Sequence, residues 1–374
     1  MILSDLHLGG SNGSATDGAF VSFLEWLAAR VQSEEGPWRL VVLGDFFDLL
    51  HPPTNVTDPL SALHAVAAGH RSVLAVLGGA ASSGIHVDLV PGNHDSELLD
   101  SDLQEHLRVL VGDAAGVDAA RLKSTFHIRP WFLIVPGLLY AEHGSQYHAL
   151  NAVADPLAPF GRWSRRMPPG AVLDLGLRGV KGGARAAALL RLLPALLRSA
   201  ADRRTRDAAT VASLQAYAEE SGLSPAALAA LRNLSEDSPV ALGRNLSAAL
   251  LRHANHVESR QQRAALAINQ ILDQEGQAVP VYVFGHTHRV AQRPLPAGDE
   301  RLQWLNTGAW ADGSYCFAEV EDRAEDVVAR LRQWDTNRRS AVTISDRRLV
   351  AQEGEPTTRA RKAGSRSADV AATP

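Results

Sequence analysis

The 374-residue chain has a single cysteine, Cys316, and therefore cannot form an intramolecular disulfide or build a thiolate metal site alone. It has no uninterrupted apolar run of about 18 residues or more, so we expect no membrane-spanning helix. A formal net charge of −4 gives no overall signal for nucleic acid or membrane binding, so any basic surface has to be local. These absences fit a globular protein of a reducing compartment, which we expect to be the cytoplasm.

The first part of the chain alternates short apolar runs with helical patterns. Residues 39–43 and 86–90 are strand-like, whereas 17–35 and 60–83 carry apolar residues at helical spacing. This alternation predicts βαβ units and a largely parallel sheet, in which ligands bind beyond the carboxyl ends of the strands. The first strand, residues 1–3, is short and has no signal peptide before it, which leaves open a true start further upstream.

The rest of the chain divides by composition. Residues 150–275 are rich in Ala, Leu and Arg, with proline and glycine breakers, and this predicts a helical insertion. Within 276–352, strand patterns return at 279–284, 302–307, 314–320 and 326–334, whereas 353–374 is polar with mixed charge and predicts a disordered tail. Residues 124–141 resemble a strand pair. The expected organisation is therefore a core formed by 1–149 and 276–352, interrupted by the insertion.

Five short polar clusters follow strand-like runs in a fixed order. They are Ser4–His7, Gly44–Asp48, Gly92–Asp95, Glu142–Gly144 and Gly285–Arg289. Their carboxylate, imidazole and amide groups suit divalent ions such as Mn, Fe or Zn. Two such ions about 3.5–4 Å apart can hold a hydroxide between them and clamp phosphoryl oxygens as charge builds. The clusters therefore point to phosphoryl chemistry.

Other groups near the clusters have catalytic or substrate-binding interpretations. His94 is the candidate catalytic residue, because an imidazolium can donate a proton near neutral pH, and Asp95 is placed to orient it. Asp48 is either a supporting carboxylate or a loop cap. Arg289 is either a phosphate-binding side chain or half of a surface salt bridge. His148 is a candidate substrate contact by its proximity to the fourth cluster.

The series D-x-H, G-D-x-x-D, G-N-H-D, H-G and G-H-T-H resembles the calcineurin-like metallophosphoesterase family over residues 1–144 and about 279–320. The resemblance implies an α/β fold, a four-layer αββα sandwich with an inserted helical lid. It also implies two divalent metal ions, with Mn preferred and Fe or Zn as alternatives, and it makes His94 the catalytic histidine. The implied ligands are Asp5, His7, Asp45 and His288 for one ion, and Asp45, Asn93, His143 and His286 for the other, with Asp45 as the bridge.

Within the family, the chain is most similar to the UDP-2,3-diacylglucosamine pyrophosphatase-like branch. The likeness rests on Ser4–Gly9, Gly44–Asp48 and the Gly285–Arg289 segment. That branch carries a helical insert that acts as a lid over a lipid substrate. Two positions depart from it, because His94 stands where that branch typically has Arg, and Ser145 replaces the Asp of its H-G-D motif. The substrate therefore stays open.

The expected function is hydrolysis of a phosphodiester, phosphomonoester or pyrophosphate bond in a small-molecule, nucleotide or lipid-linked substrate. One alternative is a nuclease or cyclic-nucleotide phosphodiesterase on the same core, and another is a non-catalytic metal-binding module. The core has no long basic track with interleaved aromatic residues, so we expect no stable nucleic acid partner. Every expected ligand position and position 94 carry a suitable side chain, and this argues against a non-catalytic binding module.

The insertion contains a basic, apolar stretch over residues 162–206, in which arginines are threaded through leucine and alanine. We expect an amphipathic lid that packs on the core and keeps its basic face in solvent. The alternative is peripheral contact with anionic lipid at the inner face of the membrane. Pro194 interrupts the helical pattern and favours the lid. The oligomeric state is left open by these patterns.

Overall fold

The structure is a computed structural model in which part of the insertion and the tail are not described. The described residues are 1–9, 13–34, 36–53, 56, 58–153, 157, 168–177, 188, 191, 217–235, 257–295, 302–323 and 326–350. The predicted tail, 353–374, and most of the basic stretch, 162–206, lie outside them. The disordered tail, the lid and the domain boundaries therefore stay predictions.

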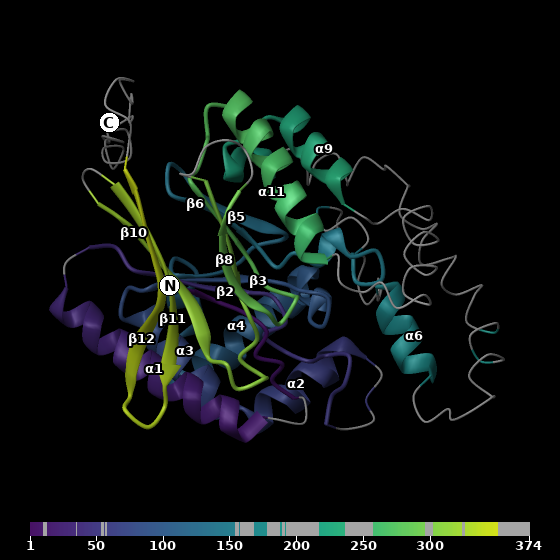
Figure 1. Ribbon diagram of the computed structural model, residues 1–374. Coiled ribbons are helices and arrows are strands. Elements are labelled where there is room, and N and C mark those ends of the chain that lie inside the picture. The colour runs from purple at the N-terminus through teal and green to yellow at the C-terminus, as the bar shows by residue number, and fades with distance from the viewer. Residues whose placement is uncertain are drawn as a thin grey trace, which may run out of the picture.

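Two β-sheets pack face to face at the centre of the molecule (Figure 1). The seven-stranded sheet has, in spatial order, β12 (Ser340–Val350), β11 (Asp326–Asp335), β10 (Cys316–Asp322), β1 (Ile2–Leu3), β2 (Arg39–Leu43), β3 (His86–Val90) and β4 (Phe126–Ile128). Strands β1 to β4 are parallel, and the C-terminal strands join β1 antiparallel.

The second sheet has five strands. Their spatial order is β5 (Phe132–Val135), β6 (Leu139–Glu142), β7 (Val281–Phe284), β9 (Gln303–Thr307) and β8 (Val290–Pro294). Strands β6, β7 and β9 are parallel, and an antiparallel strand closes each edge. The three runs expected over 124–141 are β4, β5 and β6. Because β4 ends one sheet and β5 begins the other, this segment carries the chain between the two layers.

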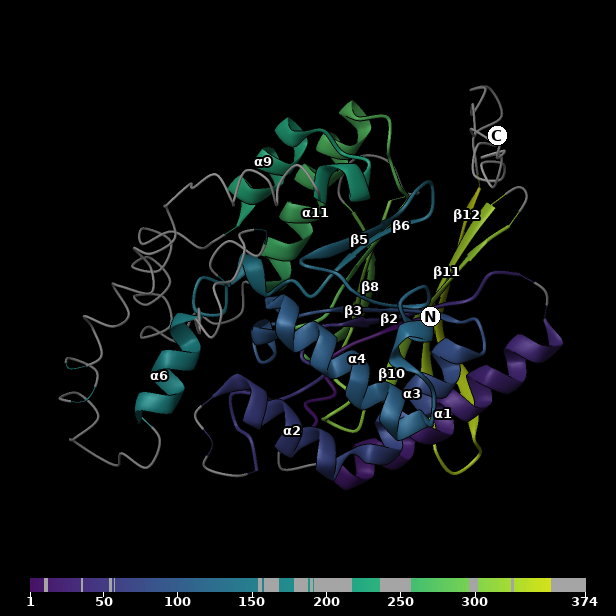
Figure 2. The same cartoon turned by 180° about the vertical axis from the view of Figure 1, so that it is seen from behind.

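Helices cover the outer face of each sheet (Figures 1 and 2). Those on the seven-stranded sheet are α1 (Gly13–Ser33), α2 (Pro59–Gly69), α3 (Arg71–Ser82), α4 (Ser101–Ala115) and the short α5 (Ala119–Leu122). Those on the five-stranded sheet are α9 (Pro225–Leu234) and α11 (Val257–Gln274), whereas α6 (Pro169–Leu177) lies to one side. Two single-turn 3₁₀ helices, Ser96–Leu99 and Ser145–Tyr147, follow β3 and β6. The predicted four-layer sandwich is confirmed.

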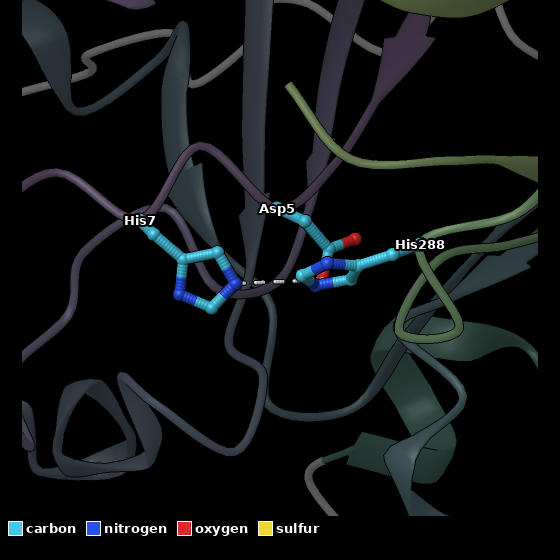
Figure 3. Close-up of side chains that lie close together, drawn as sticks. All are labelled: Asp5, His7 and His288. Carbon is cyan, nitrogen blue, oxygen red and sulfur yellow. Dashed lines mark ion pairs between the residues drawn. The ribbon is translucent and has the colours of Figure 1, made fainter. Parts of the chain in front are cut away.

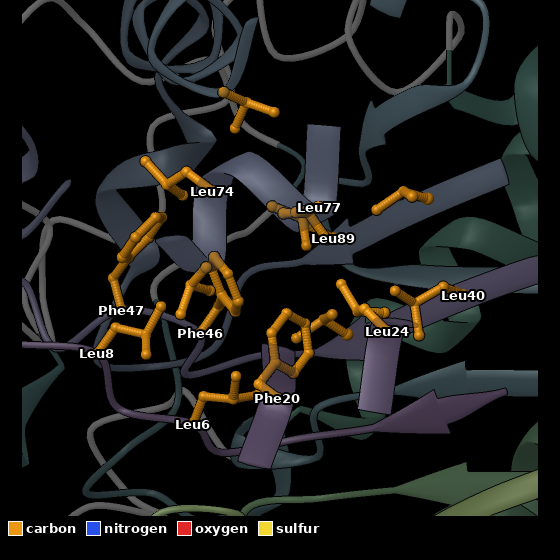
Figure 4. Close-up of a cluster of buried hydrophobic side chains, with 14 of the residues drawn as sticks. Leu6, Leu8, Phe20, Leu24, Leu40, Phe46, Phe47, Leu74, Leu77 and Leu89 are labelled. Carbon is orange, nitrogen blue, oxygen red and sulfur yellow. The ribbon is translucent and has the colours of Figure 1, made fainter. Parts of the chain in front are cut away.

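Alternation of side chains along the strands builds the three interfaces between these layers, because successive residues of a strand point to opposite faces. Leu40 of β2 faces the helices, where it packs with Phe20 and other buried side chains (Figure 4). Its neighbour Val41 faces the five-stranded sheet, and Val283 of β7 faces back toward the seven-stranded sheet. Tyr282 faces α11 on the other side. The continuous apolar runs Leu40–Leu43 of β2 and Val281–Phe284 of β7 are therefore explained by burial on both faces.

The helical pattern over 60–83 forms two helices rather than one. The break falls at His70, where the carboxylate of Asp17 lies 2.8 Å from Nδ1 and the backbone N–H of Gly9 donates to Nε2. Among the described residues, no single helix is long and apolar enough to cross a membrane. Helices α2 and α3 together have the required length and apolar composition, but the chain bends by 90° between them.

Three elements differ from the sequence prediction. Strands β8 and β12 were not predicted, because most of their residues are half-buried or exposed and carry little of the apolar pattern. Helix α11 falls within the expected insertion, yet it packs Ala265 and Ile268 onto the five-stranded sheet. Its residues are mostly polar outside one narrow apolar face, so composition alone did not separate it from the insertion.

Glu319 on β10 ties α1 to the seven-stranded sheet. The carboxylate is buried and accepts hydrogen bonds of 2.6 Å from Arg30 of α1 and of 2.6 Å from Arg332 of β11. Burial by itself would raise the pKa of Glu319, but the two guanidinium groups outweigh it and lower the pKa below its usual 4.5.

We predict that Glu319→Gln lowers the free energy of unfolding by about 3 kcal/mol near neutral pH, because two guanidinium groups lose their anion. A carboxyl whose pKa is lower in the folded state stabilises the fold above its unfolded pKa, and this contribution is lost as pH falls through the folded pKa. The difference between wild type and variant should therefore shrink as pH falls below 4.5. Denaturant unfolding measured across this range, with the more exposed Glu321→Gln as control, tests it. An undiminished difference at low pH would contradict the assignment.

Candidate metal centre

The five polar clusters meet at one edge of the sandwich. The first three follow β1, β2 and β3 of the seven-stranded sheet, and the other two follow β6 and β7 of the five-stranded sheet. Parallel strands place their carboxyl ends at the same edge of a sheet, and the packing of the sheets brings the two edges together. All seven predicted ligands lie there: Asp5, His7, Asp45, Asn93, His143, His286 and His288.

The carboxylate of Asp45 lies between two histidines. Its Oδ2 is 3.7 Å from Nε2 of His7 and 3.3 Å from Nε2 of His143. Its Oδ1 accepts a hydrogen bond of 2.8 Å from the backbone N–H of His94. Burial would raise the pKa of Asp45, but His143, His94 and His7 hold it well below its usual value. One oxygen is therefore anchored, and the other is directed between the two groups of side chains.

The first group consists of Asp5, His7 and His288, whose side chains point toward one another (Figure 3). Asp5 Oδ1 lies 3.3 Å from Nε2 of His288 and 3.9 Å from Nε2 of His7. Within the described part of the chain, the buried atoms Asp5 Oδ1 and His7 Nε2 make no hydrogen bond. A buried polar atom that makes no hydrogen bond costs about 1–3 kcal/mol. A cation between these atoms would satisfy them, so the donor set fits a metal ion.

The second group consists of Asp45, His143 and His286. Nδ1 of His143 lies 2.8 Å from the backbone oxygen of Leu43 and is placed to donate to it, which leaves Nε2 to face Asp45 and, at 3.2 Å, Oδ1 of Asn93. Burial would lower the pKa of His143, but the charges of Asp45 and Asp5 raise it to about 10. The site therefore attracts positive charge, which either a proton or a metal ion supplies.

The backbone at these residues is strained. Positive φ angles occur at Asp5 (57°), His7 (49°), Asp45 (50°), His286 (71°) and His288 (57°). In the described ranges only two other non-glycine residues, Tyr315 and Arg339, share this left-handed conformation. The conformation costs an L-residue roughly 1–2 kcal/mol. Such strain persists where the surrounding structure enforces it, and it is concentrated here at the candidate ligands.

His94 contacts a different carboxylate from the one predicted. Its Nδ1 lies 3.1 Å from Oδ1 of Asp48, whereas Asp95 accepts hydrogen bonds from four backbone N–H groups. The prediction that Asp95 orients His94 is wrong, because Asp95 is turned into the loop that carries Asp45. Burial would lower the pKa of His94, but the charges of Asp45 and Asp48 raise it to about 9.

The remaining predicted residues line the cavities beside the centre. His148 Nδ1 lies 3.1 Å from Nε2 of His286, and Asn151 approaches both rings. Arg289 lines an adjoining cavity with His148 and Asn151. Asp312 was missed from the sequence, and its Oδ2 lies 2.9 Å from Nδ1 of His288. Asp312 belongs to none of the five clusters, so no local pattern signalled it.

A two-sheet α/β sandwich with this donor set at its strand ends defines a metal-dependent phosphoric ester hydrolase. The family model for the calcineurin-like phosphoesterases matches residues 1–290, and the chain belongs to this family, whose members depend on a dinuclear metal centre. No curated protein matches the chain. The predicted family is confirmed, whereas the similarity to one branch of it stays a prediction.

Gly92 provides a test of how tightly the centre is packed. A Cβ at this position would collide with Oδ1 of Asp45. We predict that Gly92→Ala displaces the Asp45 carboxylate and weakens Mn²⁺ binding by about 10- to 100-fold, as loss of a supporting group does at metal sites. The control is Gly79→Ala on α3, where a Cβ meets nothing within 4 Å. Titration calorimetry with Mn²⁺ would contradict the account if both variants bound like wild type.

Proposed function

We propose that the two groups of side chains bind two divalent ions, with Asp45 as their shared ligand. Asp5, His7 and His288 would complete one site. Asn93, His143 and His286 would complete the other. The observation that carries the proposal is the position of Asp45 Oδ2, which faces His7 on one side and His143 on the other. Mn²⁺ is the proposed metal, since mixed imidazole and oxygen ligands suit it, and Fe and Zn are the alternatives.

When bound, the ions would supply Lewis-acid charge that activates water and offsets charge on the phosphoryl oxygens. The chain's own groups supply the remaining needs. His94 lines the same cavity as His7, Asp45 and Asn93, so its ring is close to where a phosphoryl group would lie. The carboxylate of Asp48, 3.1 Å from Nδ1 of His94, favours the protonated ring, which can deliver a proton to the leaving oxygen. Asp48 would hold the ring for that transfer.

The proposed substrate is a phosphodiester, phosphomonoester or pyrophosphate of a small or lipid-linked compound. Arg289 is 64% exposed and 3.9 Å from Glu258, a weak ion pair that a phosphate group can displace. Its cavity adjoins the centre through Asn151 and His286, which line both. A second phosphate or a headgroup placed there would reach the guanidinium while the scissile phosphate lies at the centre.

The motif likeness to the UDP-2,3-diacylglucosamine pyrophosphatase-like branch supports a pyrophosphate-linked substrate with an apolar part. Such a substrate would draw the protein to the inner face of the membrane. His94 in place of that branch's Arg argues against the same substrate, because histidine offers a proton donor at a position where arginine offers a fixed charge. The proposal therefore concerns the bond that is hydrolysed, a phosphoester or pyrophosphate bond, and does not specify the compound that carries it.

We predict that His94→Ala lowers kcat by about 10²- to 10⁴-fold, the usual cost of losing a general acid. Bound Mn²⁺ should remain at the wild-type level, since His94 is not one of the proposed ligands. Hydrolysis of a generic phosphodiester and a generic phosphomonoester by the Mn²⁺-loaded protein measures this, with the remote His106→Ala as control. Equal kcat in wild type and His94→Ala would sink the catalytic assignment, and a wild type inactive on both esters would favour a binding module.

We also predict that Arg289→Ala raises KM for a pyrophosphate-linked substrate by about tenfold and leaves kcat within twofold, because it removes ground-state binding of a phosphate. Arg293→Ala is the matched control, since Arg293 also pairs with Glu258, at 3.7 Å, but does not line the cavity. Steady-state kinetics on both variants makes the comparison. An equal change in both variants would assign the effect to Glu258 rather than to substrate contact.

A further inference from the structure

A chain of polar side chains extends from His94 away from the metal ligands. Asp48 Oδ1 lies 3.1 Å from Nδ1 of His94, and both Asp48 oxygens lie 2.9 Å from Nδ1 of His51. The other ring nitrogen of His51, Nε2, lies 2.6 Å from Oδ2 of Asp174 on α6. Two carboxylates and two imidazoles therefore alternate over a path that ends outside the core.

The carboxylate of Asp48 depends on His51 for its orientation. It lies between two imidazole rings whose centroids are 5.7 Å apart, and the backbone N–H of His51 also donates to Oδ1 at 3.1 Å. His94 alone contacts one oxygen, whereas His51 contacts both. Removing the His51 ring would free one side of the carboxylate, and a rotated Asp48 would no longer fix the ring of His94.

Asp174 in turn holds the outer end of His51. Its side chain is 61% exposed, and such an exposed pair contributes little to global stability. A surface salt bridge would explain the contact between Asp174 and His51 by itself. It would not explain why His51 is engaged at both ring nitrogens, one of them by the buried carboxylate that contacts His94. The arrangement favours positioning over stability.

We propose that His51 is a positioning residue for phosphoester hydrolysis, holding Asp48 against His94, and that Asp174 links α6 of the insertion to the catalytic histidine through it. This inference rests on the proposed function. His51 belongs to none of the five polar clusters. Sequence alone did not single it out, because its partner Asp174 is far away in the chain and comes close only in the fold.

The first test is kinetic and uses the full chain loaded with Mn²⁺. His51→Ala should lower kcat by about 10- to 100-fold, a range typical of supporting groups, and leave KM and bound Mn²⁺ unchanged. His51→Asn, whose amide can still donate to Asp48, should recover part of the loss. His106→Ala is the control, because this exposed histidine lies outside the site, with contacts to the backbone oxygen of Asp102 and the ring of His64. A His51→Ala variant with wild-type kcat would overturn the inference.

The second test asks whether His51 acts through Asp48. In an Asp48→Asn background, His51→Ala should lower kcat by no more than a further twofold, since residues that act as one unit are not additive. The same loss in both backgrounds would show an independent, merely structural effect and overturn the positioning role. A wild type that hydrolyses neither test ester would instead overturn the proposed function itself.

The third test does not depend on activity. Hydrogen exchange over residues 169–177 should be faster in both Asp174→Ala and His51→Ala than in wild type, because each removes one of the contacts between α6 and the core. Unchanged exchange in both variants would overturn the link to α6. If exchange responds while the wild type shows no hydrolysis, the contact stands and the proposed function fails, so the two failures are distinguishable.

Discussion

The candidate site depends on one buried carboxylate, that of Asp45. One oxygen is anchored by a backbone N–H, and the other faces His7 and His143 from its place between the two groups. To reach this position, Asp45 adopts a left-handed backbone conformation after β2, and Gly92 on the next loop leaves room for the carboxylate. A pair of cations bound on either side would repay both the burial of the carboxylate and the strain of its backbone.

The fold brings these side chains together, because the carboxyl ends of the parallel strands of both sheets lie at the same edge of the sandwich. Each sheet alone presents only part of the donor set: Asp5, Asp45 and Asn93 on one, and His143 and His286 on the other. The apolar interface between the sheets fixes how the two edges meet, and it is built from alternate residues of the same strands. The same strands therefore set both the core packing and the site geometry, because they bury apolar side chains between the sheets and end at the proposed metal ligands.

The sequence alone predicted the features that a short stretch of residues encodes by itself. The five clusters identified the family and the side chains that meet at the candidate centre, since each cluster is a strand end with its own glycine or polar signal. Contacts between distant segments were not accessible in this way. Asp48 and Asp95 are both near His94, but only the fold reveals that Asp48 reaches the ring and Asp95 turns into the loop. The contact of Asp312 with His288 and the packing of helix α11 on the five-stranded sheet were missed for the same reason, because the partners lie elsewhere in the chain.

The most direct test of the dinuclear centre is a crystal structure of the protein soaked in Mn²⁺, with anomalous scattering used to locate the ions. The account predicts two anomalous peaks about 3.5–4 Å apart. One should lie beside Asp5, His7 and His288, the other beside His143, and the carboxylate of Asp45 should touch both. A single peak, or two peaks that leave Asp45 without a metal contact, would contradict the account.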